Sequence, residues 1–337
     1  MTEAVYEYRK TFDPKHVEDC RTAADGEEPA DLRRDPVYVF SEEIVLAVNV
    51  ALATRRPILV RGESGTGKST LARIVAKVLG WRYYERVVTS RTQARDLLWE
   101  IDLLRRLHDA YIGKLGDDYE PYVVPGVLWW AFDPHRAEWK GGDPVEGAEP
   151  PLTDPSGVKH ERAVVLLDEI DKADPDVPNN LLVPLGSLAF EVEETGVPVA
   201  TTRERAPLVM ITTNEERELP RAFLRRCVEL RLAMPTRARL IEIARAHFES
   251  ESVEPGTKKG KKTTARELID AIVLALFGPE EKGREDEPLK VSPAELLDTV
   301  RACLRLGVTP GTPAWEALSG STVWKFGRRA PEDAGSG

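Results

Sequence analysis

Residues 62–69 combine glycines, a lysine and a serine in an order that can bind phosphate groups. The spacing G-x-x-x-x-G-K-[ST] is that of a phosphate-binding loop, in which glycines let backbone amides surround phosphate oxygens without a colliding Cβ. The lysine reaches the β- and γ-phosphates, and the serine hydroxyl is a ligand for Mg²⁺. We therefore predict that a nucleoside triphosphate, with Mg²⁺ on Ser69, binds to the following residues: Gly62, Glu63, Ser64, Gly65, Thr66, Gly67, Lys68, Ser69 and Thr70.

Two adjacent acids, Asp168 and Glu169, follow the apolar run of residues 164–167. An apolar run without alternation predicts a strand covered on both faces, and ligands of open α/β sheets bind beyond the carboxyl ends of such strands. We expect Asp168 to hold Mg²⁺, directly or through water, and Glu169 to polarise the attacking water as general base. An ordinary acidic loop is the alternative, but a phosphate loop requires an acidic partner of this kind.

Three further residues are candidates for roles in hydrolysis. Asn214 follows the predicted strand 208–212 and could orient the attacking water, whereas an isolated asparagine after a strand is usually a turn residue. Arg225 and Arg226 precede the last predicted strand, and one of them could reach the γ-phosphate in a neighbouring subunit. A surface ion pair is the alternative for these arginines.

The elements that must position these residues alternate between strands and helices. A helix over residues 42–53, capped by Ser41, precedes the phosphate loop, and apolar residues at helical spacing follow the loop up to a stop at Gly80. This alternation predicts an α/β nucleotide-binding domain with a parallel sheet over residues 36–234. The strand candidates are 58–60, 83–88, 163–167, 208–212 and 228–232.

From residue 235 the pattern becomes helical. Two capping boxes, Thr264 with Glu267 and Ser292 with Glu295, each start a predicted helix. We therefore expect a small all-helical domain over residues 235–326. We also expect an acidic, flexible segment over residues 1–35 and a disordered tail over residues 327–337.

Composition excludes several classes of protein. The chain has 337 residues, enough for about two domains, and its net charge of −10 argues against general binding to nucleic acid, which needs a basic surface. No apolar run reaches the roughly 18 residues of a membrane span, and the N-terminus lacks the apolar segment of a signal peptide. The three cysteines are widely spaced and odd in number, which favours the reducing cytoplasm over a disulfide framework.

In this order and spacing, these motifs resemble those of the AAA+ superfamily. Further stretches look like the MoxR-like branch of its helix-2-insert clade, which also holds the dynein-related ATPases. The resemblance covers about residues 36–305. The stretches that carry the closer likeness are 48–52 followed by 57–62, 95–102 continuing to 125–132, and 168–173.

The resemblance implies a five-stranded parallel sheet followed by a helical lid, and a ring, usually a hexamer, that binds nucleotide between subunits. Asn214 matches sensor 1, and Arg226 matches the arginine finger, with Arg225 as the alternative. Relatives often act with a von Willebrand A-type protein on a client enzyme, which they remodel or supply with a metal. The sequence departs from the pattern at Ala294, where a sensor-2 arginine is expected and for which Lys290 could substitute.

Three classes of function follow from these patterns. The first is Mg-dependent ATP hydrolysis in a ring that remodels or activates a protein client. The second is a slow nucleotide-dependent assembly switch, for example in a bacterial defence or conflict system, which the alanine at 294 favours. The third, which the negative charge disfavours, is a nucleic-acid motor. Residues 211–216 lack the N-K-x-D motif that reads guanine, so ATP is the expected nucleotide.

Overall fold

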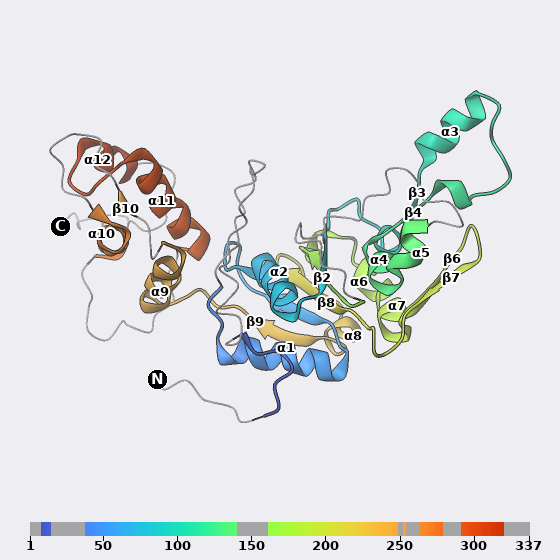
Figure 1. The fold of residues 1–337 in the computed structure, drawn as a ribbon, viewed down its shortest axis with the longest axis horizontal. Coiled ribbons are helices and arrows are strands. Elements are labelled where there is room, and N and C mark those ends of the chain that lie inside the picture. Colours follow the sequence, from blue (N-terminus) through green and yellow to red (C-terminus); the bar gives the residue numbers. More distant parts are fainter. Residues whose placement is uncertain are drawn as a thin grey trace, which may run out of the picture. The chain divides into compact units, whose positions relative to one another are not determined.

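The computed structural model describes residues 8–14, 38–139, 161–248, 252–253, 263–278 and 291–319. These residues form two compact units (Figure 1). Most of the first unit is the chain from residue 68 to residue 231. The second unit contains the loop 62–67 and the chain from residue 232 onward. The chain passes for the last time from the first unit to the second between residues 231 and 232, and the expected domain boundaries stay a prediction.

A five-stranded sheet forms the centre of the first unit. All neighbouring strands are parallel. The strands, in order across the sheet, are β2 (Arg82–Val87), β5 (Ala163–Asp168), β8 (Leu208–Thr213), β1 (Ile58–Arg61) and β9 (Val228–Arg231). The five predicted strands and the α/β fold class are confirmed, each strand to within one residue at either end. Because the strands are parallel, residues that follow them meet at the carboxyl edge of the sheet, and residues that precede them meet at the opposite, amino edge.

Helices cover the sheet. The helix α1 (Glu42–Thr54) contacts β9, α2 (Lys68–Leu79) contacts β5, and α4 (Val127–Phe132) contacts β2 and β5. Residues 164–167 of β5 have no exposed surface, as expected for a strand covered on both faces. Trp129 and Trp130 of α4 are 5% and 3% exposed and belong to the same core.

The remaining elements of this unit connect β2 to β5, β5 to β8 and β8 to β9. Two strand pairs among them, β3–β4 and β6–β7, are antiparallel, and α3, which lies between β3 and β4 in the sequence, projects away from the sheet (Figure 1). These elements are η2 (Arg95–Leu97), β3 (Trp99–Ile101), α3 (Leu103–Tyr111), η3 (Glu120–Tyr122), β4 (Val123–Pro125), α5 (Pro134–Trp139), η4 (Ile170–Lys172), α6 (Asp176–Asn180), α7 (Leu182–Ser187), β6 (Ala189–Val192), β7 (Val197–Ala200) and α8 (Arg221–Leu224).

Residues 8–14 lie within the segment expected to be flexible, but the structure anchors them to α1. Asn49 is 7% exposed, and its Oδ1 accepts hydrogen bonds from the backbone N–H groups of Thr11 at 2.6 Å and Phe12 at 2.9 Å. Its Nδ2 donates to Phe12 O at 2.8 Å, and the Phe12 side chain is fully buried. The expectation of a flexible segment is therefore wrong for these residues, because a buried amide and an apolar side chain hold them.

The second unit is helical, as predicted. Both capping boxes are present, and α11 stops at Gly307, which has φ 65°. The expected all-helical domain nevertheless contains one antiparallel pair of two-residue strands, which are too short to show the alternation that predicts a strand. Its elements are α9 (Arg237–Phe248), β10 (Ser252–Val253), β11 (Thr263–Thr264), α10 (Ala265–Phe277), α11 (Pro293–Leu306) and α12 (Pro313–Ser319).

Several expectations fall outside the described residues. They concern the tail 327–337, Lys290, and the N-terminal segment apart from residues 8–14. Within the described part of the chain, no helix is long and apolar enough to cross a membrane.

We expect the second unit to lose stability on acidification because of His247. This half-buried residue of α9 has a pKa below its usual value of about 6.5, chiefly because burial disfavours the charged ring, and Arg301 adds repulsion. A base with a lowered folded pKa opposes folding as pH falls from about 6.5 toward that lower value. Amide exchange in α9, corrected for the intrinsic effect of pH, should quicken more between pH 7.5 and 5.5 in the wild type than in His247→Gln. Equal changes in both proteins would contradict this role.

Candidate nucleotide-binding and hydrolysis site

The phosphate loop joins the end of β1 to the start of α2. Gly62, Gly65 and Gly67 have φ angles of 153°, 80° and 91°, which residues with a Cβ rarely adopt. Thr66 Oγ1 donates to Glu63 O at 2.8 Å, so the loop closes on itself. The backbone path of this loop therefore favours glycine at the two positions that the motif specifies, 62 and 67, and also at position 65.

Lys68 begins α2 and is 6% exposed. Its Nζ donates to Asn214 Oδ1 at 2.7 Å. Burial lowers the pKa of Lys68, and nearby carboxylates, Asp168 foremost, oppose that shift. A buried ammonium of this kind favours an anionic partner. Of the other predicted loop residues, Ser64 is exposed and Thr70 is half-buried in the first turn of α2.

Asp168 is the last residue of β5, and two hydroxyls donate to its carboxylate. Ser69 Oγ lies 2.9 Å from each of its carboxylate oxygens. Thr212 Oγ1, from β8, lies 2.5 Å from Oδ1. Thr212 has no exposed surface, and its oxygen also accepts the backbone N–H of Glu169 at 2.8 Å. One buried hydroxyl therefore fixes the carboxylate of the first acid and the backbone of the second.

Glu169 has a left-handed backbone, with φ 62° and ψ 49°. This conformation is uncommon for a residue with a Cβ, and such strain recurs at functional sites. Its Oε2 accepts a hydrogen bond from Lys172 Nζ at 2.6 Å, and its Oε1 accepts one from Asn214 Nδ2 at 3.1 Å. The bond to Lys172 is the main cause of a lowered pKa of Glu169, with Asn214 and Lys68 adding to it. The carboxylate is therefore ionised, and its Oε1 faces the amide of Asn214.

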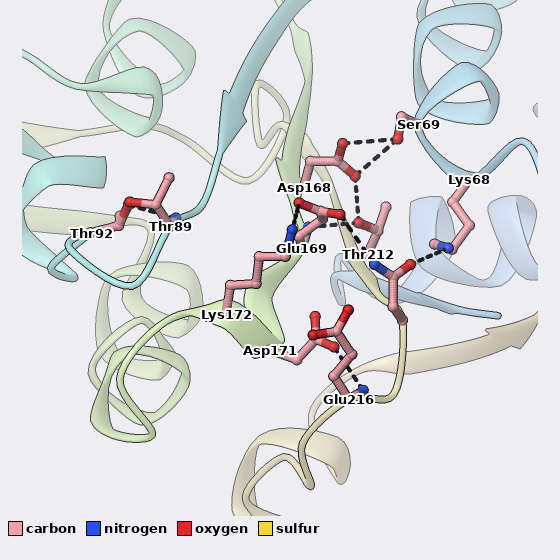
Figure 2. A network of polar contacts seen from close by, with 11 residues as sticks. Lys68, Ser69, Thr89, Thr92, Asp168, Glu169, Asp171, Lys172, Thr212 and Glu216 are labelled. Atoms are coloured by element: carbon pink, nitrogen blue, oxygen red, sulfur yellow. Dashed lines mark hydrogen bonds and ion pairs between the residues drawn. The ribbon is translucent and has the colours of Figure 1, made fainter. Parts of the chain in front are cut away.

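The structure brings five sequence-predicted residues together at the carboxyl edge. We call Lys68, Ser69, Asp168, Glu169 and Asn214 the edge cluster. Asn214 connects its two halves, because the amide contacts both the lysine and the second acid. Figure 2 shows the side chains of α2, β5 and β8 directed toward one another at this edge.

Sequence reasoning missed three polar residues beside the edge cluster. Thr212 carries a detectable signal, a hydroxyl at the end of an otherwise apolar run, whereas Lys172 is one cation in a charged stretch. Asp171 is 3% exposed and accepts the backbone N–H of Glu216 at 3.0 Å, which ties η4 to the loop after β8 (Figure 2). Its other carboxylate oxygen has no hydrogen-bond partner among the described residues.

Arg225 and Arg226 do not join the edge cluster. They lie in the turn between α8 and β9, before the first strand residue Val228, and therefore at the amino edge of the sheet. The cluster lies at the carboxyl edge, and strands of four to six residues span roughly 13–20 Å. An arginine side chain is too short to cover this distance. Both arginines are exposed, and neither forms an ion pair with another described residue.

The fold and the edge cluster define the class of protein. They are those of a P-loop ATPase of the AAA+ superfamily. A family model described as an AAA domain of the dynein-related subfamily matches residues 57–227, half of the chain. The chain belongs to this family. The predicted AAA+ class is thereby confirmed.

The chain is also similar to individual proteins. It is 32% identical to the aerobic cobaltochelatase subunit CobS of a Sinorhizobium species over 114 residues, which are 33% of this chain and 32% of CobS. It is 35% identical to midasin of Giardia intestinalis over 75 residues, 20% of this chain and 2% of midasin. The matches therefore span about a third or less of these relatives. Among solved structures, the Holliday junction branch migration motor RuvB of Thermotoga maritima matches with a TM-score of 0.40 and 16% identity, over 79% of this chain and 61% of RuvB.

We expect Thr212→Val to impair turnover more than nucleotide affinity. The substitution keeps the shape of the side chain but removes the donor to Asp168 and the acceptor for the backbone of Glu169. Losing both bonds should lower kcat by about tenfold or more. Thr213→Val is a matched control, since Thr213 is equally buried on the same strand but its hydroxyl accepts from the backbone of Glu215 instead. Equal kcat values in the two variants would refute the role of Thr212.

Proposed function

We propose that this chain hydrolyses Mg·ATP as a ring-forming, MoxR-like AAA+ ATPase that remodels or activates a protein client, together with a von Willebrand A-type partner. One observation carries the proposal: the edge cluster joins a buried lysine, a hydroxyl, two acids and an amide by hydrogen bonds at a single edge. Phosphoryl transfer needs these groups, because it depends on positioning and on stabilising charge more than on covalent chemistry.

Each residue of the edge cluster has a role in this proposal. The loop amides and Lys68 bind the β- and γ-phosphates of ATP. Asn214 orients the attacking water, and Glu169 accepts a proton from it. The Glu169 carboxylate is ionised at neutral pH, as its lowered pKa requires, and an ionised carboxylate can accept a proton.

The residues present also fit a magnesium ion. Ser69 and Asp168 place a hydroxyl and a carboxylate within 2.9 Å of each other, and hard oxygen donors of this kind suit Mg²⁺. In the described residues no group of three or more acids, histidines or cysteines could hold a metal. Two protein ligands suit Mg²⁺, which usually keeps waters and binds substrate phosphates. When bound, the ion would neutralise developing charge on the phosphate oxygens.

The position of the two candidate finger arginines supports a ring in which the site is shared between subunits. Arg226, or Arg225, lies at the amino edge of the sheet and is free of ion pairs in the described structure, so it serves a phosphate in a neighbouring copy and not its own. Such a heterologous contact, repeated by rotation, closes into a ring. The arginine then stabilises charge at the γ-phosphate across the interface.

The proposed client and partner are supported by likeness to related proteins. CobS is named as a subunit of a cobaltochelatase, so a related chain acts as one part of a multi-subunit enzyme. This supports a protein client for the present chain.

Cys227 and Cys303 are buried free thiols, which supports a location in the reducing cytoplasm.

A second candidate is a slow nucleotide-dependent assembly switch. Ala294 is the second residue of α11, where the sensor-2 arginine is expected. Its side chain has neither a charge nor a hydrogen-bond donor. The contact between Lys172 and Glu169 also holds the proposed base in one place. A switch would show slow basal hydrolysis that no client or partner accelerates, whereas a remodeller would be stimulated.

The proposed chemistry is tested by Glu169→Gln. The variant keeps the shape of the side chain but cannot accept the proton, so kcat should fall by about 100-fold or more while ATP affinity is retained. Turnover is measured by phosphate release and affinity by calorimetry. Glu218→Gln, an exposed acid outside the edge cluster, should hydrolyse ATP at the wild-type rate. Parental turnover in Glu169→Gln would remove Glu169 as the base.

The same variant tests assembly. Because it retains ATP, light scattering in Mg·ATP should find Glu169→Gln as a particle of several subunits. A monomer at all concentrations would contradict the ring.

A further inference from the structure

One side chain holds the turn that carries the two candidate finger arginines. Arg56 lies in the short connection between α1 and β1, and its guanidinium donates to three successive carbonyls of the turn. Its Nε lies 3.1 Å from Arg226 O, its Nη2 lies 2.9 Å from Cys227 O, and Nη2 also donates to Arg225 O. The connection runs beside the turn, because the Val228 N–H donates to Pro57 O at 2.8 Å.

The geometry of these bonds is specific to arginine. The helix α8 has only four residues, and the carbonyls at and after its end need donors from outside the helix. A planar guanidinium offers several N–H groups in a fixed fork, whereas the ammonium of lysine is a compact point charge on a flexible chain. The Cys227 side chain is 5% exposed and belongs to the hydrophobic core, which also holds the turn.

Hydrogen bonds hold the backbone of the turn 225–227, but the side chains of its two arginines are not held by ion pairs within the described part of the chain. Arg225 and Arg226 are exposed and form no ion pair with other described residues. In a chain with 57 acids and 47 lysines and arginines, two adjacent uncommitted guanidinium groups on an immobilised turn suggest a target outside the subunit. Because the turn is already held, less conformational entropy is lost when one of these arginines binds that target.

We infer that Arg56 is a positioning residue for the arginine finger: it fixes the turn 225–227 so that Arg226, or Arg225, reaches the nucleotide of the neighbouring subunit. The inference rests on the proposed function, in which the site is shared between subunits. Arg56 does not touch the nucleotide. Its effect on hydrolysis therefore appears in the neighbour and not in its own edge cluster.

The first test is kinetic. Arg56→Ala should lower kcat by about tenfold to 100-fold, because small misplacements of a catalytic group are costly, while the affinity for ATP at its own loop stays within about twofold. Arg56→Lys should show an intermediate kcat. Arg55→Asn is the matched control: Arg55 is the neighbouring residue, donates to Arg203 O at 2.9 Å instead, and has a left-handed backbone that asparagine tolerates. It should hydrolyse ATP at the wild-type rate.

The decisive test combines two kinds of variant subunit in one ring. Glu169→Gln subunits lack the base but keep the finger, and Arg226→Ala subunits (or Arg225→Ala, if that arginine is the finger) lack the finger but keep the base. In an equimolar mixed ring, about a quarter of the interfaces combine an intact base with an intact finger, so activity should return. Arg56→Ala subunits mixed with Glu169→Gln subunits should behave in the same way and exceed the mean of the two separate proteins.

The outcomes separate this inference from the proposed function. If neither Arg226→Ala nor Arg225→Ala is rescued by Glu169→Gln, the shared site itself is wrong. If one of them is rescued and Arg56→Ala is not, the shared site stands and the role of Arg56 is overturned. Arg56→Lys is mixed in the same way if Arg56→Ala does not fold. Failure of both variants to fold would also overturn the inference, since Arg56 would then be needed for the fold alone.

Discussion

The site depends on a buried cation, Lys68, that lies near two partly buried acids at one edge of a parallel sheet. Lys68 is almost completely removed from water, and Asp168 and Glu169 lie close enough to influence its pKa. Charges in such a place are tolerated only when hydrogen bonds satisfy them. The hydroxyls of Ser69 and Thr212 and the amide of Asn214 supply those bonds. Phosphates and a divalent ion can enter such an arrangement because each finds a partner of opposite charge already in place.

The parallel topology divides the proposed functional groups between two edges of the sheet. The edge cluster follows the strands, whereas Arg225 and Arg226 precede β9. A single copy cannot bring these two sets together, which is a physical argument for the proposed assembly that is independent of family likeness. Arg56 has a related proposed role, because its hydrogen bonds hold the turn at the amino edge that would face a neighbouring subunit.

The parts of the site that sequence could predict are those coded by local spacing. The glycines at 62, 65 and 67 specify a backbone path within eight residues, and two acids after an apolar run mark the end of a buried strand. The hydroxyl of Thr212 at the end of an apolar run is visible in the sequence, but its role could not be assigned in this way. Its contact with Asp168 depends on the register of β5 and β8, in which Leu167 pairs with Ile211, and the sequence does not state that register.

Long-range contacts were likewise beyond prediction. The anchoring of Phe12 by Asn49 joins residues 37 positions apart, and the bonds from Arg56 to the turn before β9 join residues about 170 apart. Such contacts follow from tertiary packing and leave no periodic pattern in the sequence. The acidic composition of the segment 1–35 predicts flexibility, but its residues 8–14 are held against α1 by contacts of this kind.

The most direct test of the central claim is the affinity for a non-hydrolysable Mg·ATP analogue, measured by calorimetry in the wild type and in Lys68→Ala. If the buried ammonium binds the phosphates, affinity should fall roughly tenfold to 100-fold or more in the variant. Lys77→Ala, which removes a lysine from the last turn of the same helix, should bind as the wild type does. Unchanged affinity in a folded Lys68→Ala protein would contradict the account.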